Sequence, residues 1–141
     1  MKPRCVLDTN VLVAALRSSR GASFELLRRV PLGCFTLSVS VPLVMEYAEV
    51  LARPGLVPVT GAAVAAVLDM VCAHSDPQPI HFLWRPQLTD PNDEMVLEAA
   101  VNSGAAFLVT HYVGDFTPAS RFGVKVVTPA QFLLHLEGDK P

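Results

Sequence analysis

Short apolar runs alternate along the chain with longer segments of helical periodicity. A run such as residues 5–7 is typical of a buried strand, whereas apolar residues at every third or fourth position are typical of a helix packed on a sheet. On this basis we expect strands at residues 5–7, 35–39, 80–83, 106–110 and 124–127. We expect helices at residues 11–16, 22–30, 41–53, 62–73, 90–102 and 129–137.

Strands that alternate with helices across short connections predict a parallel sheet covered on both faces. The helix boundaries carry fitting residues, because Ser40 and Asp90 are good N-caps and Gly104 is a typical helix stop. The chain has no internal repeat, low-complexity segment or linker. We therefore expect an α/β fold, a three-layer α/β/α sandwich, built as a single domain over residues 1–141.

Composition narrows the class of protein. The chain is 51% apolar and 17% charged, with a mean hydropathy of +0.40, which excludes a disordered chain and favours a buried self-interface. No run reaches the roughly 20 apolar residues that a membrane helix needs. The first residues lack the apolar region and cleavage site of a signal peptide. We therefore expect a cytoplasmic protein that does not span a membrane.

Charge gives no general indication of a polyanionic partner, because 11 basic and 13 acidic residues leave a net charge of −2. Nucleic-acid binding would therefore depend on a local patch. Arg17 and Arg20 follow the first predicted helix and are our candidates for phosphate contacts. Each could equally be a solvated surface charge.

Two acids stand at predicted strand and helix ends, where open parallel sheets bind ligands. Asp8 follows the first strand, although an Asp at such a corner is also a common turn or cap residue. Asp93 lies within the apolar arc of helix 92–102, where an unpaired carboxylate is costly. Its alternative role is that of a first-turn acid favoured by the helix dipole. Glu94 and Glu98 fall on the far side and are expected to face solvent.

Two more acids are ambiguous when taken singly. Glu46 borders the apolar arc of helix 41–53, and Asp115 lies in the loop after the fourth strand. Together with Asp8 and Asp93 they have one common use, which is to bind a hard dication such as Mg²⁺ or Mn²⁺. Such an ion can activate water and neutralise a phosphodiester. The histidines and cysteines are scattered, which argues against zinc.

Several segments, in this order, resemble the PIN-domain family. They are residues 6–12 (VLDTNVL), 44–47 (VMEY), 90–93 (DPND), 97–100 (LEAA) and 104–110 (GAAFLVT). The resemblance spans essentially the whole chain and is strongest to the branch of VapC-like toxins from toxin–antitoxin pairs. It implies a short parallel sheet of about five strands and a Mg²⁺- or Mn²⁺-dependent endoribonuclease that cleaves single-stranded RNA.

The resemblance also implies roles for particular residues and partners. Asp8, Glu46 and Asp93 would be the metal-binding, catalytic acids, with Asp90 as a helper. Many PIN domains place a fourth acid two residues after the strand-end threonine, where this chain has Tyr112. Asp115 resembles the substitute used in one branch of the family. A small cognate antitoxin and a homodimer are the implied protein partners.

Two other classes of function stay open. A phosphotransfer enzyme with Asp8 as nucleophile would need a second acid two residues later, where the chain has Asn10. A catalytically weak, PIN-like protein-interaction module is favoured by the apolar composition and by Tyr112. The inward positions of Glu46 and Asp93 argue against such a module.

Overall fold

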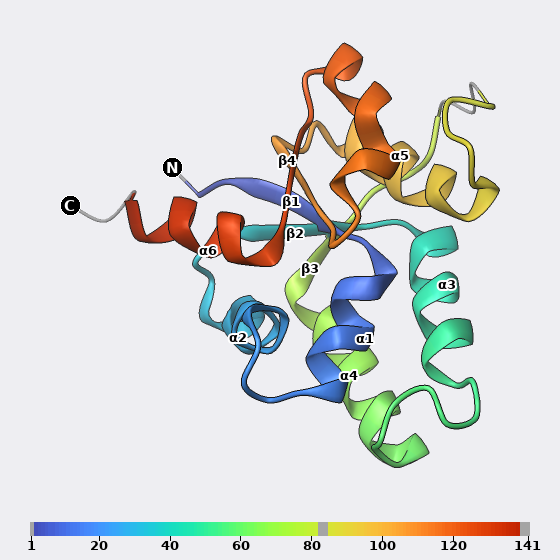
Figure 1. Ribbon diagram of the computed structural model, residues 1–141, viewed down its shortest axis with the longest axis vertical. Coiled ribbons are helices and arrows are strands. Elements are labelled where there is room, and N and C mark those ends of the chain that lie inside the picture. The colour runs from blue at the N-terminus through green and yellow to red at the C-terminus, as the bar shows by residue number, and fades with distance from the viewer. Residues whose placement is uncertain (1, 82–84, 139–141) are drawn as a thin grey trace.

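The computed structural model describes residues 2–81 and 85–138 (Figure 1). Its five strands form one parallel sheet in the order β3-β2-β1-β4-β5. The strands are β1 (Arg4–Leu7), β2 (Thr36–Val39), β3 (Ser75–Pro77), β4 (Phe107–Val109) and β5 (Lys125–Val127). This sheet confirms the predicted α/β fold class.

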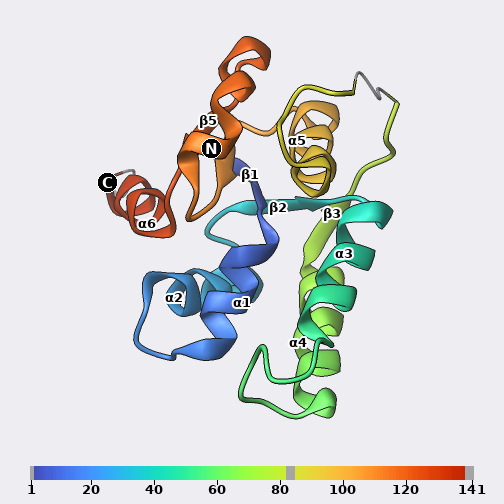
Figure 2. The same ribbon diagram turned by 45° about the vertical axis from the view of Figure 1, so that its right-hand side comes forward.

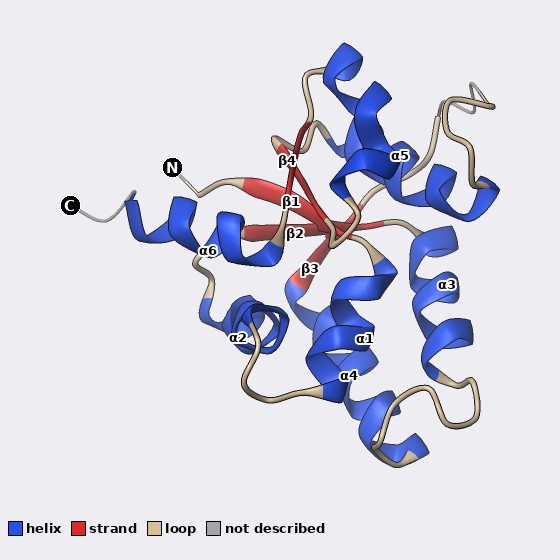
Figure 3. Cartoon of the chain, in the orientation of Figure 1, coloured by secondary structure: helices blue, strands red, loops and turns tan. Residues whose placement is uncertain are grey.

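Helices cover both faces of the sheet, as Figures 2 and 3 show. The α-helices are α1 (Thr9–Arg17), α2 (Ala22–Arg29), α3 (Val41–Leu51), α4 (Gly61–His74), α5 (Pro91–Ser103) and α6 (Pro129–Gly138). Two 3₁₀ segments, η1 (Val30–Leu32) and η2 (Val113–Phe122), complete the described elements. Helix α5 and η2 lie on one side, and α1, α2, α4 and α6 lie on the other. No helix in the described residues is long and apolar enough to cross a membrane.

The strand order creates a crevice between β1 and β4. From β1 the chain proceeds to β2 and β3 on one side of the sheet, and from β4 it proceeds to β5 on the other side. Because parallel crossovers are right-handed, the connections that leave β1 and β4 diverge to opposite faces. Such a switch point is where open α/β sheets bind ligands.

The core of the sheet is packed by large, fully buried side chains. Phe132 of α6 makes edge-on contacts with Phe35 and Phe107, with ring centroids 5.5 and 5.2 Å apart. Tyr47 of α3 is completely buried, and its hydroxyl donates a hydrogen bond to the carbonyl oxygen of Leu7. This bond ties α3 to the carboxyl end of β1, where the predicted site begins.

The third strand lies at Ser75–Pro77, five residues before its predicted position. Residues 80–81 form no strand, and residues 82–83 of that prediction lie outside the described residues. A proline-containing strand is tolerated here because β3 is at the sheet edge and needs no second partner. Asp76 also binds Arg4, with 2.7 Å between carboxylate oxygen and guanidinium nitrogen.

Candidate active site

Asp8 follows β1 directly and lies at the switch point. The register pairs Leu7 with Val109, which brings Asp8 opposite Thr110 at the end of β4. Oδ1 of Asp8 accepts a hydrogen bond from the backbone N–H of Thr9 at 2.7 Å. Oδ2 accepts from Asn10 Nδ2 at 2.7 Å and from Thr110 Oγ1 at 2.8 Å. The carboxylate, whose residue is only 5% exposed, is therefore both a helix cap and a firmly held group in the site.

The start of α5 supplies two further carboxylates. Asp90 caps the helix, because its Oδ1 accepts a hydrogen bond from the backbone N–H of Asn92 at 2.9 Å. Pro91 follows at the first helical position, where its missing N–H costs nothing. Asp93 lies in the first turn and is only partly buried. The sequence of this helix start thus directs both acids to one end of α5.

Helix α3 and the segment after β4 complete the acidic group. Glu46 is partly buried and lies one turn before Val50 on α3, and Arg53 follows just after the end of that helix. Asp115 lies in the first turn of η2, and its backbone N–H donates to the carbonyl oxygen of Tyr112 at 3.0 Å. The next residue, Phe116, is fully buried and anchors this turn against the core.

All five predicted acids line one cleft of about 370 Å³, which we call the acidic cleft. Its acidic members are Asp8, Glu46, Asp90, Asp93 and Asp115. A second depression of about 340 Å³ adjoins it and shares three of these acids. The structure therefore brings together, from four separate segments, the carboxylates that the sequence singled out.

The electrostatics of the acidic cleft disfavour a full set of ionised carboxylates. Burial, followed by the charges of the other four acids, raises the pKa of Asp93 to about 7. Burial also raises the pKa of Asp8, although the hydrogen bonds from Thr110, Thr9 and Asn10 oppose the rise. The pKa of Glu46 is raised, chiefly by burial and the charge of Glu49. A dication in the cleft would relieve this repulsion.

The donor atoms in the acidic cleft fit a hard cation. Carboxylate oxygens are the ligands that Mg²⁺ and Mn²⁺ prefer. Among the described residues, no three Asp, Glu, His or Cys side chains form a ready-made cage around an ion. A dication held by one or two carboxylates and several waters fits such a set, since Mg²⁺ normally keeps much of its water.

The two predicted phosphate-contacting arginines are placed differently. Arg17 lines a depression of about 430 Å³, which we call the Arg17 depression, and which adjoins the acidic cleft. Arg20 is exposed in the turn after α1 and lines neither hollow. The cleft is instead lined by Arg53, whose charge lowers the pKa of Glu46. The spacing of Arg53 from Glu46 along the predicted helix could have identified it.

Three contacts that support the site around Asp8 were not predicted from the sequence. Asn10 and Thr110 both donate to Asp8, and Asn10 Oδ1 accepts the backbone N–H of His111 at 3.1 Å. In the sequence, Asn10 and Thr110 are distinguished only as residues of a turn and of a strand end. Their positions next to a strand-end aspartate are the signal that could have indicated a supporting role.

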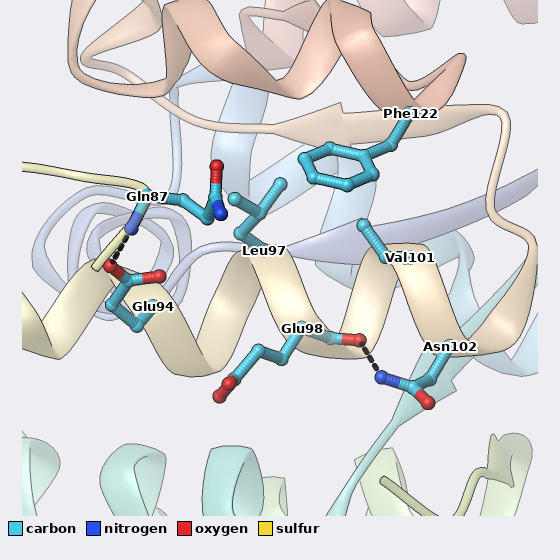
Figure 4. Close-up of a pocket in the computed structure, with 7 residues that line it drawn as sticks. All are labelled: Gln87, Glu94, Leu97, Glu98, Val101, Asn102 and Phe122. Carbon is cyan, nitrogen blue, oxygen red and sulfur yellow. Dashed lines mark hydrogen bonds between the residues drawn. The ribbon is translucent and has the colours of Figure 1, made fainter. Parts of the chain in front are cut away.

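The expectation that Glu94 and Glu98 face solvent is wrong, because both are buried and hydrogen-bonded by the segment that precedes α5. Figure 4 shows the contact between Gln87 and Glu94. Glu94 is 2% exposed, and its Oε1 accepts the backbone N–H groups of Gln87 and Leu88 at 2.6 and 2.9 Å. Glu98 accepts two hydrogen bonds from the guanidinium of Arg85, at 3.2 and 2.7 Å. We call these contacts the Glu94–Glu98 clamp. The periodicity of one helix does not show which of its outer residues are buried by another segment of the chain.

Comparison with known proteins gives a family match and two similar folds. A family model described as PIN domain matches residues 4–113. No curated protein sequence matches the chain. The VapBC2 structure from Rickettsia felis, bound to a DNA fragment from its promoter, has a similar chain with TM-score 0.60 and 14% identity, covering 89% of this chain and 98% of that one. The FitAB structure bound to an IR36 DNA fragment gives TM-score 0.55 and 19% identity, covering 89% and 94%.

Proposed function

The chain belongs to the PIN-domain family, whose members are generally nucleases, and from this premise we propose that it is a Mg²⁺- or Mn²⁺-dependent endoribonuclease. Residues 1–141 would form a single domain that hydrolyses single-stranded RNA. The observation that carries this proposal is the meeting of five carboxylates in one cleft at the β1/β4 switch point. A phosphotransfer enzyme that uses Asp8 as nucleophile is not favoured, because Asn10 stands where such an enzyme would need its second acid.

In this proposal Asp8, Glu46, Asp93 and Asp115 hold the ion, with Asp90 assisting. When bound, the ion would supply Lewis-acid activation of water and offset the charge that develops on the phosphodiester. Asp8 contributes a fixed ligand direction, because Thr9, Asn10 and Thr110 already orient its carboxylate. This arrangement reduces the ordering that substrate binding would otherwise require.

The substrate strand would reach the acidic cleft along a path that includes Arg17, with Arg20 further out. Arg17 lines the depression next to the cleft and makes no ion pair with any described residue. A free guanidinium suits phosphate contact, because it presents several donors in a rigid fork. Arg53 offers a second positive group inside the cleft itself.

We also propose that the protein is the toxin of a toxin–antitoxin pair, with a small antitoxin partner and a homodimeric state. The support is the resemblance to VapC-like proteins and the likeness to chains of VapBC2 and FitAB, which are named as complexes. The apolar composition also favours a self-interface. Light scattering of the isolated chain tests the dimer directly.

A catalytically weak interaction module is the second candidate. Tyr112 stands where many relatives have an acid, and Asp115 is exposed, so the fourth ligand is the least constrained member of the set. An RNA cleavage assay distinguishes this candidate from the nuclease, because a module without catalysis would leave RNA intact with every metal.

The decisive experiment is cleavage of an end-labelled single-stranded RNA in Mg²⁺, in Mn²⁺ and in EDTA. We expect cleavage with either metal, none in EDTA, and none with Asp93→Asn. Asp69→Asn is the matched control, because Asp69 is an exposed acid on α4 outside the cleft. Equal cleavage in EDTA, or full activity of Asp93→Asn, would contradict the proposed site.

A further inference from the structure

Tyr112 stands at the boundary between the acidic cleft and the Arg17 depression. It lines both hollows, together with Asn10 and Val13 of the α1 region. It is also 61% exposed, which is unusual for a large aromatic residue. Among the described residues, its side chain makes no hydrogen bond or ring contact. Packing of the fold therefore does not explain an aromatic ring at this position.

The backbone beneath this ring is held on both sides. The N–H of Tyr112 donates to Thr110 Oγ1 at 3.1 Å, and its carbonyl oxygen accepts from the N–H of Asp115 at 3.0 Å. The preceding His111 is fixed as well, because its Nε2 lies 2.7 Å from the hydroxyl oxygen of Ser23. Because this backbone is already ordered, little further ordering is needed when a ligand binds the Tyr112 side chain, which favours binding.

The groups on either side of Tyr112 suit successive phosphates of one strand. Asn10, Val13 and Arg17 lie at positions i, i+3 and i+7 of one helix face and line the Arg17 depression. Arg17 therefore lies about 10 Å along α1 from Asn10, at about 1.5 Å per residue. Stacked nucleotides rise about 3.4 Å each, so a few nucleotides cover this distance. Tyr112 lines both hollows, so it lies between the carboxylates and the guanidinium, where a base of that strand would pass.

We propose that Tyr112 is a stacking platform for an unpaired nucleobase next to the cleaved phosphodiester, with Arg17 holding a phosphate beyond that base. Aromatic side chains stack on any base, because every base has a π-face. The face of a base inside a duplex is already covered by its neighbours. The platform therefore selects single-stranded nucleic acid without reading its sequence.

This inference rests on the proposed nuclease function and adds a binding residue to it. The inference distinguishes two contributions to RNA binding, which are charge contact with a phosphate and stacking on a base. Arg17 contributes a charge contact, which releases counterions and weakens with salt. Tyr112 contributes stacking, which has no such counterion dependence. The two side chains can therefore be distinguished by how RNA affinity changes with salt concentration.

The test measures binding of a fluorescent 12-nucleotide single-stranded RNA by anisotropy, in Mg²⁺, with Asp93→Asn as background to prevent cleavage. Tyr112→Leu should weaken binding about 5- to 150-fold, the range that one stacked base supports, while Tyr112→Phe should keep most of the affinity. Arg17→Ala should reduce the slope of log K against log salt by about 0.7, and Tyr112→Leu should leave it unchanged. Leu134→Ala is the control, because Leu134 is similarly exposed on distant α6.

A second arm locates the base. Each oligonucleotide in a series carries one abasic site, and the site moves stepwise past the cleavage position. We expect a single position at which the abasic site lowers the RNA affinity of the protein with Tyr112 and of Tyr112→Phe. Tyr112→Leu should be insensitive to the abasic site at that same position. The affinity for a duplex of the same sequence should be the same for the protein with Tyr112 and for Tyr112→Leu.

The outcomes separate this inference from the proposed function. If the protein with all its acids cleaves RNA but Tyr112→Leu binds as tightly as the tyrosine form, the platform is overturned and the nuclease stands. Equal losses of RNA affinity for Tyr112→Leu and Tyr112→Phe also overturn the platform, because the aromatic ring would not be the determinant. Unchanged RNA binding with a lost homodimer would assign Tyr112 to a protein interface instead. If no RNA is cleaved with either metal, the nuclease proposal itself fails.

Discussion

Replacing Asp93 with asparagine should stabilise the metal-free protein while it removes the proposed activity. Two effects of the Asp93 carboxylate have opposite signs. The N-terminus of α5 attracts a negative charge in its first turn, which typically contributes about 0.3–1 kcal/mol. Partial burial, followed by the charges of the four neighbouring acids, disfavours the same charge and raises the pKa of Asp93 to about 7. A rise in pKa of this size exceeds the contribution of the helix N-terminus, so we expect the unfavourable effects to dominate.

The size of the gain follows from that pKa. When a pKa differs by 1 between the folded and unfolded states, the difference corresponds to about 1.4 kcal/mol of stability. Asp93 is partly open to solvent, where screening reduces such interactions severalfold, so we expect a gain of about 1–2 kcal/mol rather than the full conversion. For a domain of this length, that gain corresponds to a rise in Tm of about 3–8 °C.

The pH dependence has a definite sign. The folded protein binds the Asp93 proton more tightly than the unfolded chain, whose carboxyl titrates near its ordinary pKa of 3.8. The stability contributed by the protonated group is therefore fully present below pH 3.8 and is lost as the pH rises towards about 7. The advantage of asparagine should grow over this interval and then level off.

Urea unfolding of both proteins in EDTA, at pH 5 and pH 8, measures this difference. We expect the larger gain at pH 8, and addition of Mg²⁺ should then raise the Tm of the unsubstituted protein but not that of Asp93→Asn. Asp69→Asn should show no such gain in stability, and its Tm should rise with Mg²⁺ as that of the unsubstituted protein does, because the cleft acids are all present. A variant that is less stable than the unsubstituted protein at pH 8 would refute the reasoning and would identify Asp93 as a helix-start residue.

Further predictions concern the supports of the site and the state of the chain. Asp8→Asn should abolish cleavage but, unlike Asp93→Asn, destabilise the fold by about 1–3 kcal/mol in urea unfolding. In either orientation of the amide, its NH₂ would face at least one donor from which a carboxylate oxygen now accepts a hydrogen bond. Glu94→Ala should lower the unfolding free energy by about 2 kcal/mol, and Glu94→Gln by clearly less, because glutamine keeps an acceptor for the two backbone N–H groups. Arg20→Ala should change RNA affinity, measured by anisotropy, less than Arg17→Ala. Light scattering at micromolar concentration should report a dimer, and a monomer would count against the self-interface.

The sequence predicted the six α-helices and four of the strands because each has a strong local pattern. The 3₁₀ segment η2, which carries Asp115, was expected to be a loop. Asp93 was identified because its inward position breaks the apolar arc of its own helix. The third strand was misplaced because a proline-containing edge strand has no local pattern of its own. The burial of Glu94 was missed because it depends on residues 85–90, which approach α5 from outside the helix. Local periodicity reports which side of a helix faces the sheet, and tertiary contacts decide what covers the other side.

The Glu94–Glu98 clamp has a consequence for the direction of Asp93. Adjacent residues of a helix point about 100° apart, so a rotation of α5 by one position would exchange Asp93 for Glu94 at the cleft. Glu94 holds two backbone N–H groups, and Glu98 holds Arg85 one turn later, so α5 is fixed in its rotation about its own axis. The clamp thus sets the phase of the helix. Inserting one residue between Asp90 and Asp93 would leave the clamp intact and disrupt the helix start that carries these two acids.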